Sequence, residues 1–125
     1  MRSYRIEVYT PAYGPGAPAG TDANMYVTLY GTRASSDELL VGTPGRRGAV
    51  VGAQPGIDSL TVQLADLGQI TRVHVRHDNA GVAPGWFLDR VVVSDDAGGR
   101  WTFPCQRWLA RHEDDGAIER VLDAA

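Results

Sequence analysis

Glycine and proline interrupt this chain so often that no long regular element fits between the breaks. The 125 residues contain fifteen Gly and seven Pro, and the segment Pro11–Gly20 alone holds three of each. Short apolar runs joined by frequent turns are typical of a protein built from β-strands. Pro11–Gly20 itself is predicted to be irregular, because proline fixes φ and removes a backbone donor.

The runs between the breaks show the two-residue period of half-buried strands. In Tyr4–Thr10 every second residue is apolar. Asn24–Gly31 alternates in the same way and carries the rings of Tyr26 and Tyr30 on its second face, so both of its faces offer apolar surface. The remaining predicted strands are Glu38–Val41, Ser59–Leu64, Gly68–His77, Trp86–Ser94 and Arg100–Phe103.

Only two C-terminal segments can be read as helical. They are Trp108–His112 and Ala117–Ala125, and the second alternates as well as it fits a helical turn. About eight short strands with no long helical period between them favour an all-β fold, an antiparallel β-sandwich. The length fits one domain, so we expect residues 1–125 to form a single sandwich.

Charge and composition exclude several classes of function. The net charge is −3, with twelve basic and fifteen acidic side chains, which gives no broad field to attract nucleic acid. The single Cys105 excludes an internal disulfide and a thiolate metal cluster, and we expect it to behave as a small buried apolar residue.

No apolar run is long enough for a transmembrane segment. The start of the chain lacks a signal peptide, which predicts a cytoplasmic protein or a domain excised from a longer secreted one.

Seven short motifs follow one another along the chain. They are Gly20–Gly31, Leu67–Gly68, His77–Asn79, Pro84–Leu88, Trp101–Cys105, Trp108–Leu109 and Asp114–Gly116. Together they resemble the PLAT domain, also called the lipoxygenase homology (LH2) domain, over about Tyr4 to Leu122. The resemblance implies an eight-stranded antiparallel β-sandwich of two four-stranded sheets. In that family the domain accompanies a lipid-active catalytic domain or a membrane channel and takes part in calcium-assisted docking on membranes or on a partner protein.

The resemblance also implies a calcium site among the loops at one end of the sandwich. Calcium takes about six to eight oxygen ligands from carboxylates, amides and backbone carbonyls. The residues alone leave a second interpretation for Asp22 and Asp78, because Asp in a turn also caps backbone amides. The ligands carried over from the family are Gly20 through its carbonyl, Asp22, Asp37, Glu38 and Asp78.

Loop and strand-end residues are the candidates for contact with lipid or a partner. Aromatic rings suit the headgroup region of a membrane, and arginine attracts lipid phosphate. Trp86 and Phe87 are successive strand residues, so one of the two rings should enter the core. A basic turn can also be merely solvated, and Trp101, Phe103 and Trp108 are expected to pack in the core or at an edge. The candidate contacts are Tyr13, Val82, Trp86, Arg46 and Arg47.

Catalysis is not expected from this chain. It has no Gly-x-Ser-x-Gly motif that would present a nucleophile. His74 and His77 fall on opposite faces of one strand by parity, so they do not converge on a metal, and His112 is expected to be exposed.

The sequence therefore favours a non-catalytic, monomeric binding module that docks on membrane lipid with the help of calcium. The alternative is a protein-docking module for a lipase, a protease or another partner, with the aromatic face of Asn24–Gly31 as its surface. A third alternative is a structural subunit that self-associates.

Overall fold

The computed structural model describes residues 1–11, 13–18, 21, 23–42, 56–80 and 85–125. Eight strands form two four-stranded antiparallel sheets, and two further strands form a short hairpin. Among the described residues there is no helix of the length and apolar character that crosses a bilayer. The strands are β1 (Arg2–Thr10), β2 (Tyr13–Gly14), β3 (Ala17–Pro18), β4 (Met25–Gly31), β5 (Leu39–Gly42), β6 (Gly56–Leu64), β7 (Ile70–His77), β8 (Trp86–Asp95), β9 (Arg100–Leu109) and β10 (Glu119–Asp123).

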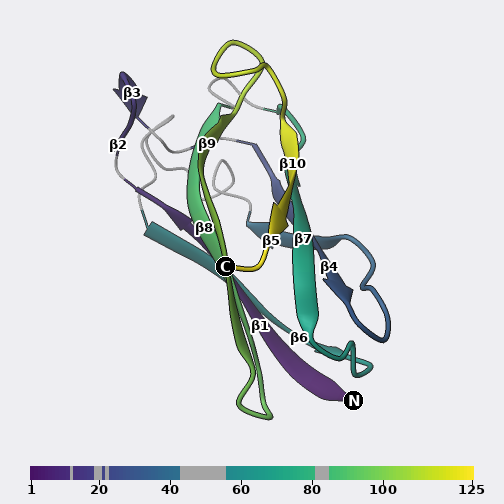
Figure 1. The fold of residues 1–125 in the computed structure, drawn as a ribbon. Coiled ribbons are helices and arrows are strands. Elements are labelled where there is room, and N and C mark those ends of the chain that lie inside the picture. The colour runs from purple at the N-terminus through teal and green to yellow at the C-terminus, as the bar shows by residue number, and fades with distance from the viewer. Residues whose placement is uncertain (12, 19–20, 22, 43–55, 81–84) are drawn as a thin grey trace.

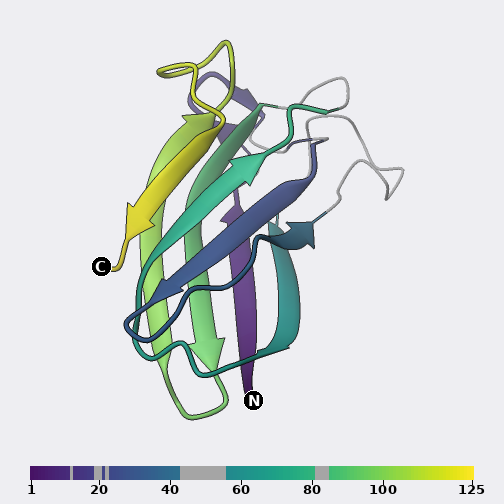
Figure 2. The same cartoon turned by 90° about the vertical axis from the view of Figure 1, so that its right-hand side faces the viewer.

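The two sheets face each other as layers, which confirms the predicted sandwich (Figures 1 and 2). One sheet has the strand order β6-β1-β8-β9, and the other has the order β10-β7-β4-β5. Strands β5 and β6 are therefore the edges on one side of the sandwich, and β9 and β10 are the edges on the other.

The core lies between the layers and follows the alternation that the sequence predicts. Since successive strand residues point to opposite faces, every second side chain of β1 and β4 enters the core. On β4 the tyrosine rings remain half-buried on the outer face. The inward residues of these two strands are fully buried: Tyr4, Ile6, Val8, Met25, Val27 and Leu29.

Strand β9 continues beyond its predicted end at Phe103, through Pro104 to Leu109. Proline removes one donor from a ladder, and an edge strand tolerates this where the missing N–H would point away from the sheet. Leu109 pairs with Trp86 of β8. The helical interpretation of Trp108–His112 is therefore wrong, because the segment begins inside a β-ladder.

Two other segments also contain more strand than expected. Strand β10 pairs with β7, so the strand interpretation of Ala117–Ala125 is correct and the helical one is not. Strands β2 and β3 pair with each other within the Pro/Gly-rich segment that was predicted to be irregular. Two residues on each side are enough for this small hairpin.

The turn at Leu67–Gly68 closes one end of the sandwich. The backbone N–H of Leu67 donates to the hydroxyl of buried Tyr4 at 2.9 Å, and the carbonyl of Leu67 accepts from the N–H of Arg33 at 2.9 Å. A Cβ on Gly31 would lie 2.0 Å from that carbonyl oxygen, so only glycine fits there. The motif Leu67–Gly68 and the last glycine of the motif Gly20–Gly31 are thus explained by packing.

Candidate functional site

The opposite end of the sandwich carries the predicted calcium loops. Strand β1 ends there at Thr10, β4 begins there at Met25 and β7 ends there at His77 (Figure 2). We call this the loop end. It is tied to the core where the indole N–H of buried Trp86 donates to the Thr10 hydroxyl at 2.9 Å.

Asp78 lies at the loop end directly after β7, and its carboxylate is held by hydrogen bonds. Oδ1 accepts from the backbone N–H of Asn24 at 3.0 Å and of Ala80 at 3.2 Å, and Oδ2 accepts from the side-chain amide of Asn24 at 2.6 Å. Partial burial acts to raise the pKa of Asp78, but the hydrogen bonds from Asn24 and Ala80 outweigh it and lower that pKa. The carboxylate is therefore charged at neutral pH.

His77 fixes the turn in which Asp78 lies. Its fully buried ring has Nε2 at 2.6 Å from the carbonyl oxygen of Leu109 and Nδ1 at 2.9 Å from the N–H of Asn79, which donates to it. Nε2 thus carries the hydrogen and Nδ1 accepts. Desolvation lowers the pKa of His77, which favours the neutral ring that these two hydrogen bonds require.

The predicted parity of the two histidines is confirmed. His74 lies on the outer face of the same strand, where its Nε2 is 3.0 Å from a carboxylate oxygen of Glu119. His112 is exposed, as expected. Sequence reasoning did not predict that His77 links β7 to β9, because that contact depends on how the two sheets pack.

Only part of the predicted calcium set can be located. Gly20 and Asp22 lie outside the described residues. Thr21, between them in the sequence, is buried and accepts the N–H of Ala23 at 3.0 Å. Asp78 does cap its turn, as the second interpretation has it, and it also presents a charged carboxylate at the loop end. Among the described residues, no three His, Cys, Asp or Glu side chains are grouped so as to hold a metal ion.

The predicted ligands Asp37 and Glu38 do not lie with Asp78. Glu38 precedes the residue of β5 that pairs with Val27, whereas Asp78 follows the residue of β7 that pairs with Met25. This register separates the two backbones by about four residues, or about 13 Å, along β4. Glu38 is instead engaged by Arg76 through two hydrogen bonds of 2.7 and 2.6 Å, and Asp37 is exposed beside it. One cation cannot contact Glu38 and Asp78 together.

The expectation that Trp86 contacts lipid or a partner is wrong. Its ring is 0% exposed, so it cannot contact lipid or a partner in this structure. Phe87 takes the outer face, as strand parity requires, and packs edge-on against Trp108 with ring centroids 5.5 Å apart. A Cβ on Gly14 would lie 2.8 Å from both of these side chains, so the β2–β3 hairpin rests directly on the ring pair.

The side chains of the other predicted contact residues lie outside the part of the chain that the structure describes. Val82, Arg46 and Arg47 lie outside the described residues, and Tyr13 belongs to β2 but its side chain is likewise not described. These four remain predictions.

The outer face of the β10-β7-β4-β5 sheet pairs arginines with the two tyrosines. The guanidinium of Arg76 lies 4.2 Å from the ring centroid of Tyr26, and that of Arg72 lies 5.2 Å from the ring centroid of Tyr30. Exposed apolar side chains flank this face on both edge strands: Leu40 is 43% exposed and Val121 is 57% exposed. The face is therefore less purely aromatic than the sequence predicts, because cations cover its rings.

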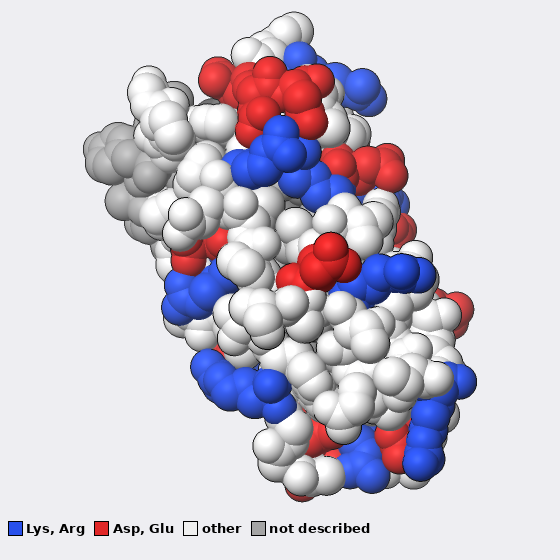
Figure 3. All heavy atoms as spheres, viewed as in Figure 1, with Lys and Arg blue, Asp and Glu red and all other residues white. Residues whose placement is uncertain are grey.

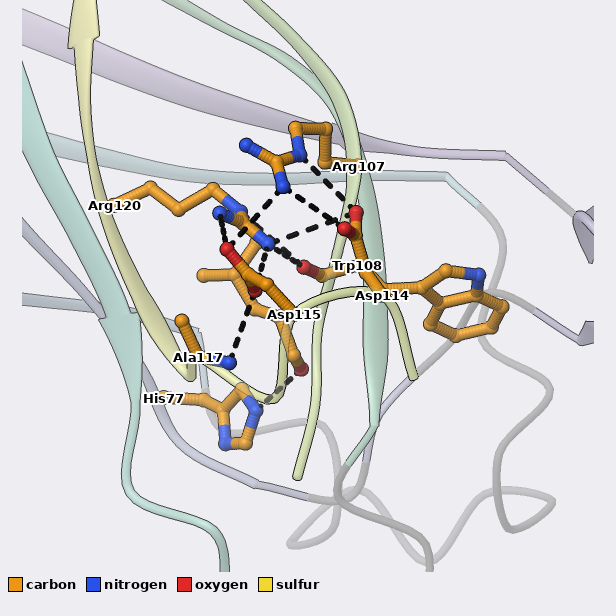
Figure 4. A network of polar contacts seen from close by, with 8 residues as sticks. His77, Arg107, Trp108, Asp114, Asp115, Ala117 and Arg120 are labelled. Atoms are coloured by element: carbon orange, nitrogen blue, oxygen red, sulfur yellow. Dashed lines mark hydrogen bonds and ion pairs between the residues drawn. The ribbon is translucent and has the colours of Figure 1, made fainter. Parts of the chain in front are cut away.

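An ion-pair network fixes the connection between β9 and β10 (Figure 4). The Arg120 guanidinium donates to the carbonyl oxygen of Trp108 at 2.7 Å and to both oxygens of Asp115 at 2.8 and 3.0 Å. Arg107 donates to both oxygens of Asp114 at 3.1 and 2.8 Å. Hydrogen bonds from Arg120 and Arg107 respectively hold the pKa values of Asp115 and Asp114 below their usual range. Asp114 and Asp115 therefore stabilise the connection between β9 and β10.

Charges of both signs are mixed on the side of the molecule that Figure 3 shows. Figure 3 shows acidic side chains gathered at the top beside basic ones, and both signs scattered below. No single-sign patch stands out on this view, in keeping with the net charge of −3.

Cys105 on β9 is half-buried and packs against the core. Burial raises the pKa of its thiol, so Cys105 is not an activated nucleophile.

Comparison with known proteins agrees with this geometry. The family model for the PLAT/LH2 domain matches residues 4–123. The mouse lipoxygenase homology domain-containing protein 1 is 44% identical over 105 residues, which cover 83% of this chain and 5% of that protein. Human polycystin-1-like protein 3 is 35% identical over 121 residues, 95% of this chain and 7% of that protein. The chain thus spans only a small fraction of the length of these relatives.

A solved structure shows the same fold. Coral 8R-lipoxygenase, whose crystal structure is described as showing calcium activation via a C2-like domain, superposes with a TM-score of 0.74 at 25% identity, over 98% of this chain and 17% of that one. The family match over nearly the whole chain, together with the strand order described above, shows that the chain belongs to the PLAT/LH2 domain family, whose domain is a non-catalytic module in lipoxygenases and polycystins.

Proposed function

We propose that this chain is a docking domain that binds a lipid surface through its loop end, with calcium held between the protein and lipid phosphate. The observation that carries the proposal is the Asp78 carboxylate, which is ordered, charged and positioned at that end by Asn24 and Ala80. The calcium activation described for the C2-like domain of coral 8R-lipoxygenase supports the same chemistry here.

The donor types at the loop end suit calcium. Asp78 offers a carboxylate and Asn24 an amide oxygen, and calcium prefers such hard oxygen ligands. Two groups do not fill six to eight positions, so the proposal requires further oxygens. The carbonyl of Gly20 and the carboxylate of Asp22 are the proposed additional ligands, and water or lipid phosphate would complete the set. Asp37 and Glu38 are not included.

Apolar and basic loop residues would strengthen the contact with the membrane. Tyr13 and Val82 are the proposed apolar contacts, and Arg46 and Arg47 are the proposed phosphate contacts. A basic side chain near an anionic surface contributes about 1 kcal/mol. These contributions would act after calcium has neutralised the carboxylates at the loop end, because Asp78 otherwise repels an anionic surface.

Co-sedimentation with vesicles tests the proposal. The purified domain is mixed with vesicles of phosphatidylserine and phosphatidylcholine in calcium or in EDTA. We expect sedimentation in calcium and none in EDTA. Asp78→Asn should raise the calcium concentration needed for half-maximal binding on the order of tenfold or more, since even an indirect partner of a metal contributes that much. Asp22→Asn should act in the same direction.

The matched control is Asp123→Asn, which removes the same charge from an exposed residue at the far end of β10. It should leave the calcium requirement unchanged. Equal binding in EDTA and calcium, or equal effects of Asp78→Asn and Asp123→Asn, would contradict the proposal that calcium assists binding to the vesicles.

A second candidate function is protein docking through the outer face of the β10-β7-β4-β5 sheet. The exposed Leu40 and Val121, together with the arginine-covered tyrosines, favour it, because aromatic residues, arginine and apolar side chains are typical of protein interfaces. The partner would be a lipase, a protease or another protein. Leu40→Glu should abolish capture of such a partner while calcium-dependent sedimentation with vesicles persists. Capture unaffected by Leu40→Glu would exclude this face.

A further inference from the structure

The four sheet edges of this sandwich differ in how they are protected against pairing with another strand. An edge strand presents unpaired N–H and C=O groups, and proteins protect edges by making them short, charged, bulged or interrupted by proline. Strand β5 has only four residues. Strand β10 has five, and it carries the charged side chains of Glu119, Arg120 and Asp123.

Strand β9 is long but carries several protective features. Pro104 lacks an N–H, Gln106 has a φ of 52°, and Arg100 and Arg107 place charge along the strand. A left-handed residue and a proline within three positions prevent a regular ladder from forming on the free side. These three edges are therefore poor templates for another strand.

From Ile57 to Leu64, strand β6 has no proline, no residue with a positive φ and no outward charge. It spans nine residues, Gly56–Leu64, and pairs with β1 over its whole length without a register shift. Its one charged residue, Asp58, is buried and points inward near one end of the strand, so the edge from Ser59 to Leu64 carries no charge on either face. In the described part of the chain β6 pairs on one side only. Its outward side chains are all exposed and uncharged: Ile57, Ser59, Thr61 and Gln63.

We propose that β6 pairs antiparallel with β6 of a second copy of this chain, joining two four-stranded sheets into one continuous sheet. A two-fold axis at Leu60 sets Ser59 of each copy opposite Thr61 of the other, and Ile57 opposite Gln63. Cross-strand neighbours of this kind attract weakly or are neutral, and no like charges meet. The strand is thus complementary to itself, as a two-fold interface requires.

A single pair of strands makes a small interface, so this dimer should dissociate on dilution. It differs from the monomer that the sequence predicts. The proposal does not depend on calcium or lipid, because the contact runs along β6 and includes neither Asp78 nor Asn24.

Sedimentation equilibrium in EDTA, from micromolar to millimolar protein, tests the dimer. We expect the wild-type mass to rise from monomer toward dimer with concentration. Ser59→Lys with Thr61→Lys places lysines opposite each other twice across the axis, and the dissociation constant should rise on the order of tenfold or more. Ser59→Lys with Thr61→Glu places Lys opposite Glu twice and should restore or strengthen dimerisation.

The matched control adds the same two positive charges elsewhere, through Ala97→Lys with Ala124→Lys at exposed positions. This variant should dimerise like the wild type. A monomer mass for the wild type at every concentration would overturn the proposal. An undiminished dimer for the double-lysine variant would overturn it too, and failure of the lysine–glutamate variant to dimerise would overturn the pairing about Leu60. Thermal unfolding of each variant checks that it is folded.

Discussion

The hydrogen bond between Tyr4 and Leu67 offers a clean test of how the sandwich is closed. Tyr4→Phe removes one oxygen atom from a ring that is 0% exposed and leaves the ring in place. Leu67 is only 3% exposed, and its N–H then loses the acceptor that lies 2.9 Å away. A buried donor left without a partner costs about 1–3 kcal/mol. We therefore expect the free energy of unfolding to fall by about that amount.

Urea unfolding followed by tryptophan fluorescence measures this change. The transition midpoint should move to lower urea while the slope stays constant, because the surface exposed on unfolding is the same. Tyr30→Phe is the matched control, since it removes the same atom from a half-buried ring on the outer face. Its effect should stay within about 0.5 kcal/mol. Equal effects of the two substitutions would refute the role given to the Tyr4 hydroxyl.

Two further predictions concern Gly31 and His77. Gly31→Ala should lower the free energy of unfolding by about 2–3 kcal/mol or more, because the new methyl would lie 2.0 Å from the Leu67 carbonyl oxygen. The control is Gly85→Ala, whose methyl would meet only Ala110 at 3.4 Å. It should be nearly neutral in the same urea experiment. The pKa of His77 is lowered in the folded state, so its contribution to stability is present above its unfolded pKa of about 6.5 and is lost as pH falls through its folded pKa. Wild type should thus lose stability below about pH 6.5 more steeply than His77→Asn. Parallel curves for the two proteins would contradict this assignment.

The alternation of apolar residues was enough to predict most of this fold. Strands β1 and β4 appear where their two-residue periods place them, because a half-buried strand needs only local pattern to define its inner face. The continuation of β9 through Pro104 was missed for a physical reason. Proline is incompatible with a central strand but acceptable at an edge, and edge position is a property of the whole sheet.

The candidate site was harder to predict because it depends on register between distant strands. Strand parity correctly requires one of Trp86 and Phe87 to enter the core, but it does not say which one. The choice of Trp86 is explained by its indole N–H, which finds the Thr10 hydroxyl on a neighbouring strand. In the same way, the engagement of Glu38 by Arg76 depends on β5 and β7 flanking β4 at a particular offset.

The proposed docking site and the proposed dimer constrain each other through geometry. Strand β6 begins at the loop end, where Gly56 pairs with Thr10, and runs away from it to Leu64. Antiparallel pairing of two β6 strands therefore turns one copy by half a revolution, and the two loop ends point in opposite directions. A dimer of this kind cannot place both copies of Asp78 on one flat membrane. Such a dimer can only join two membranes, whereas docking of both copies on the same membrane requires monomers. Dilution would therefore favour attachment to a single membrane, and high local concentration would favour bridging between two membranes.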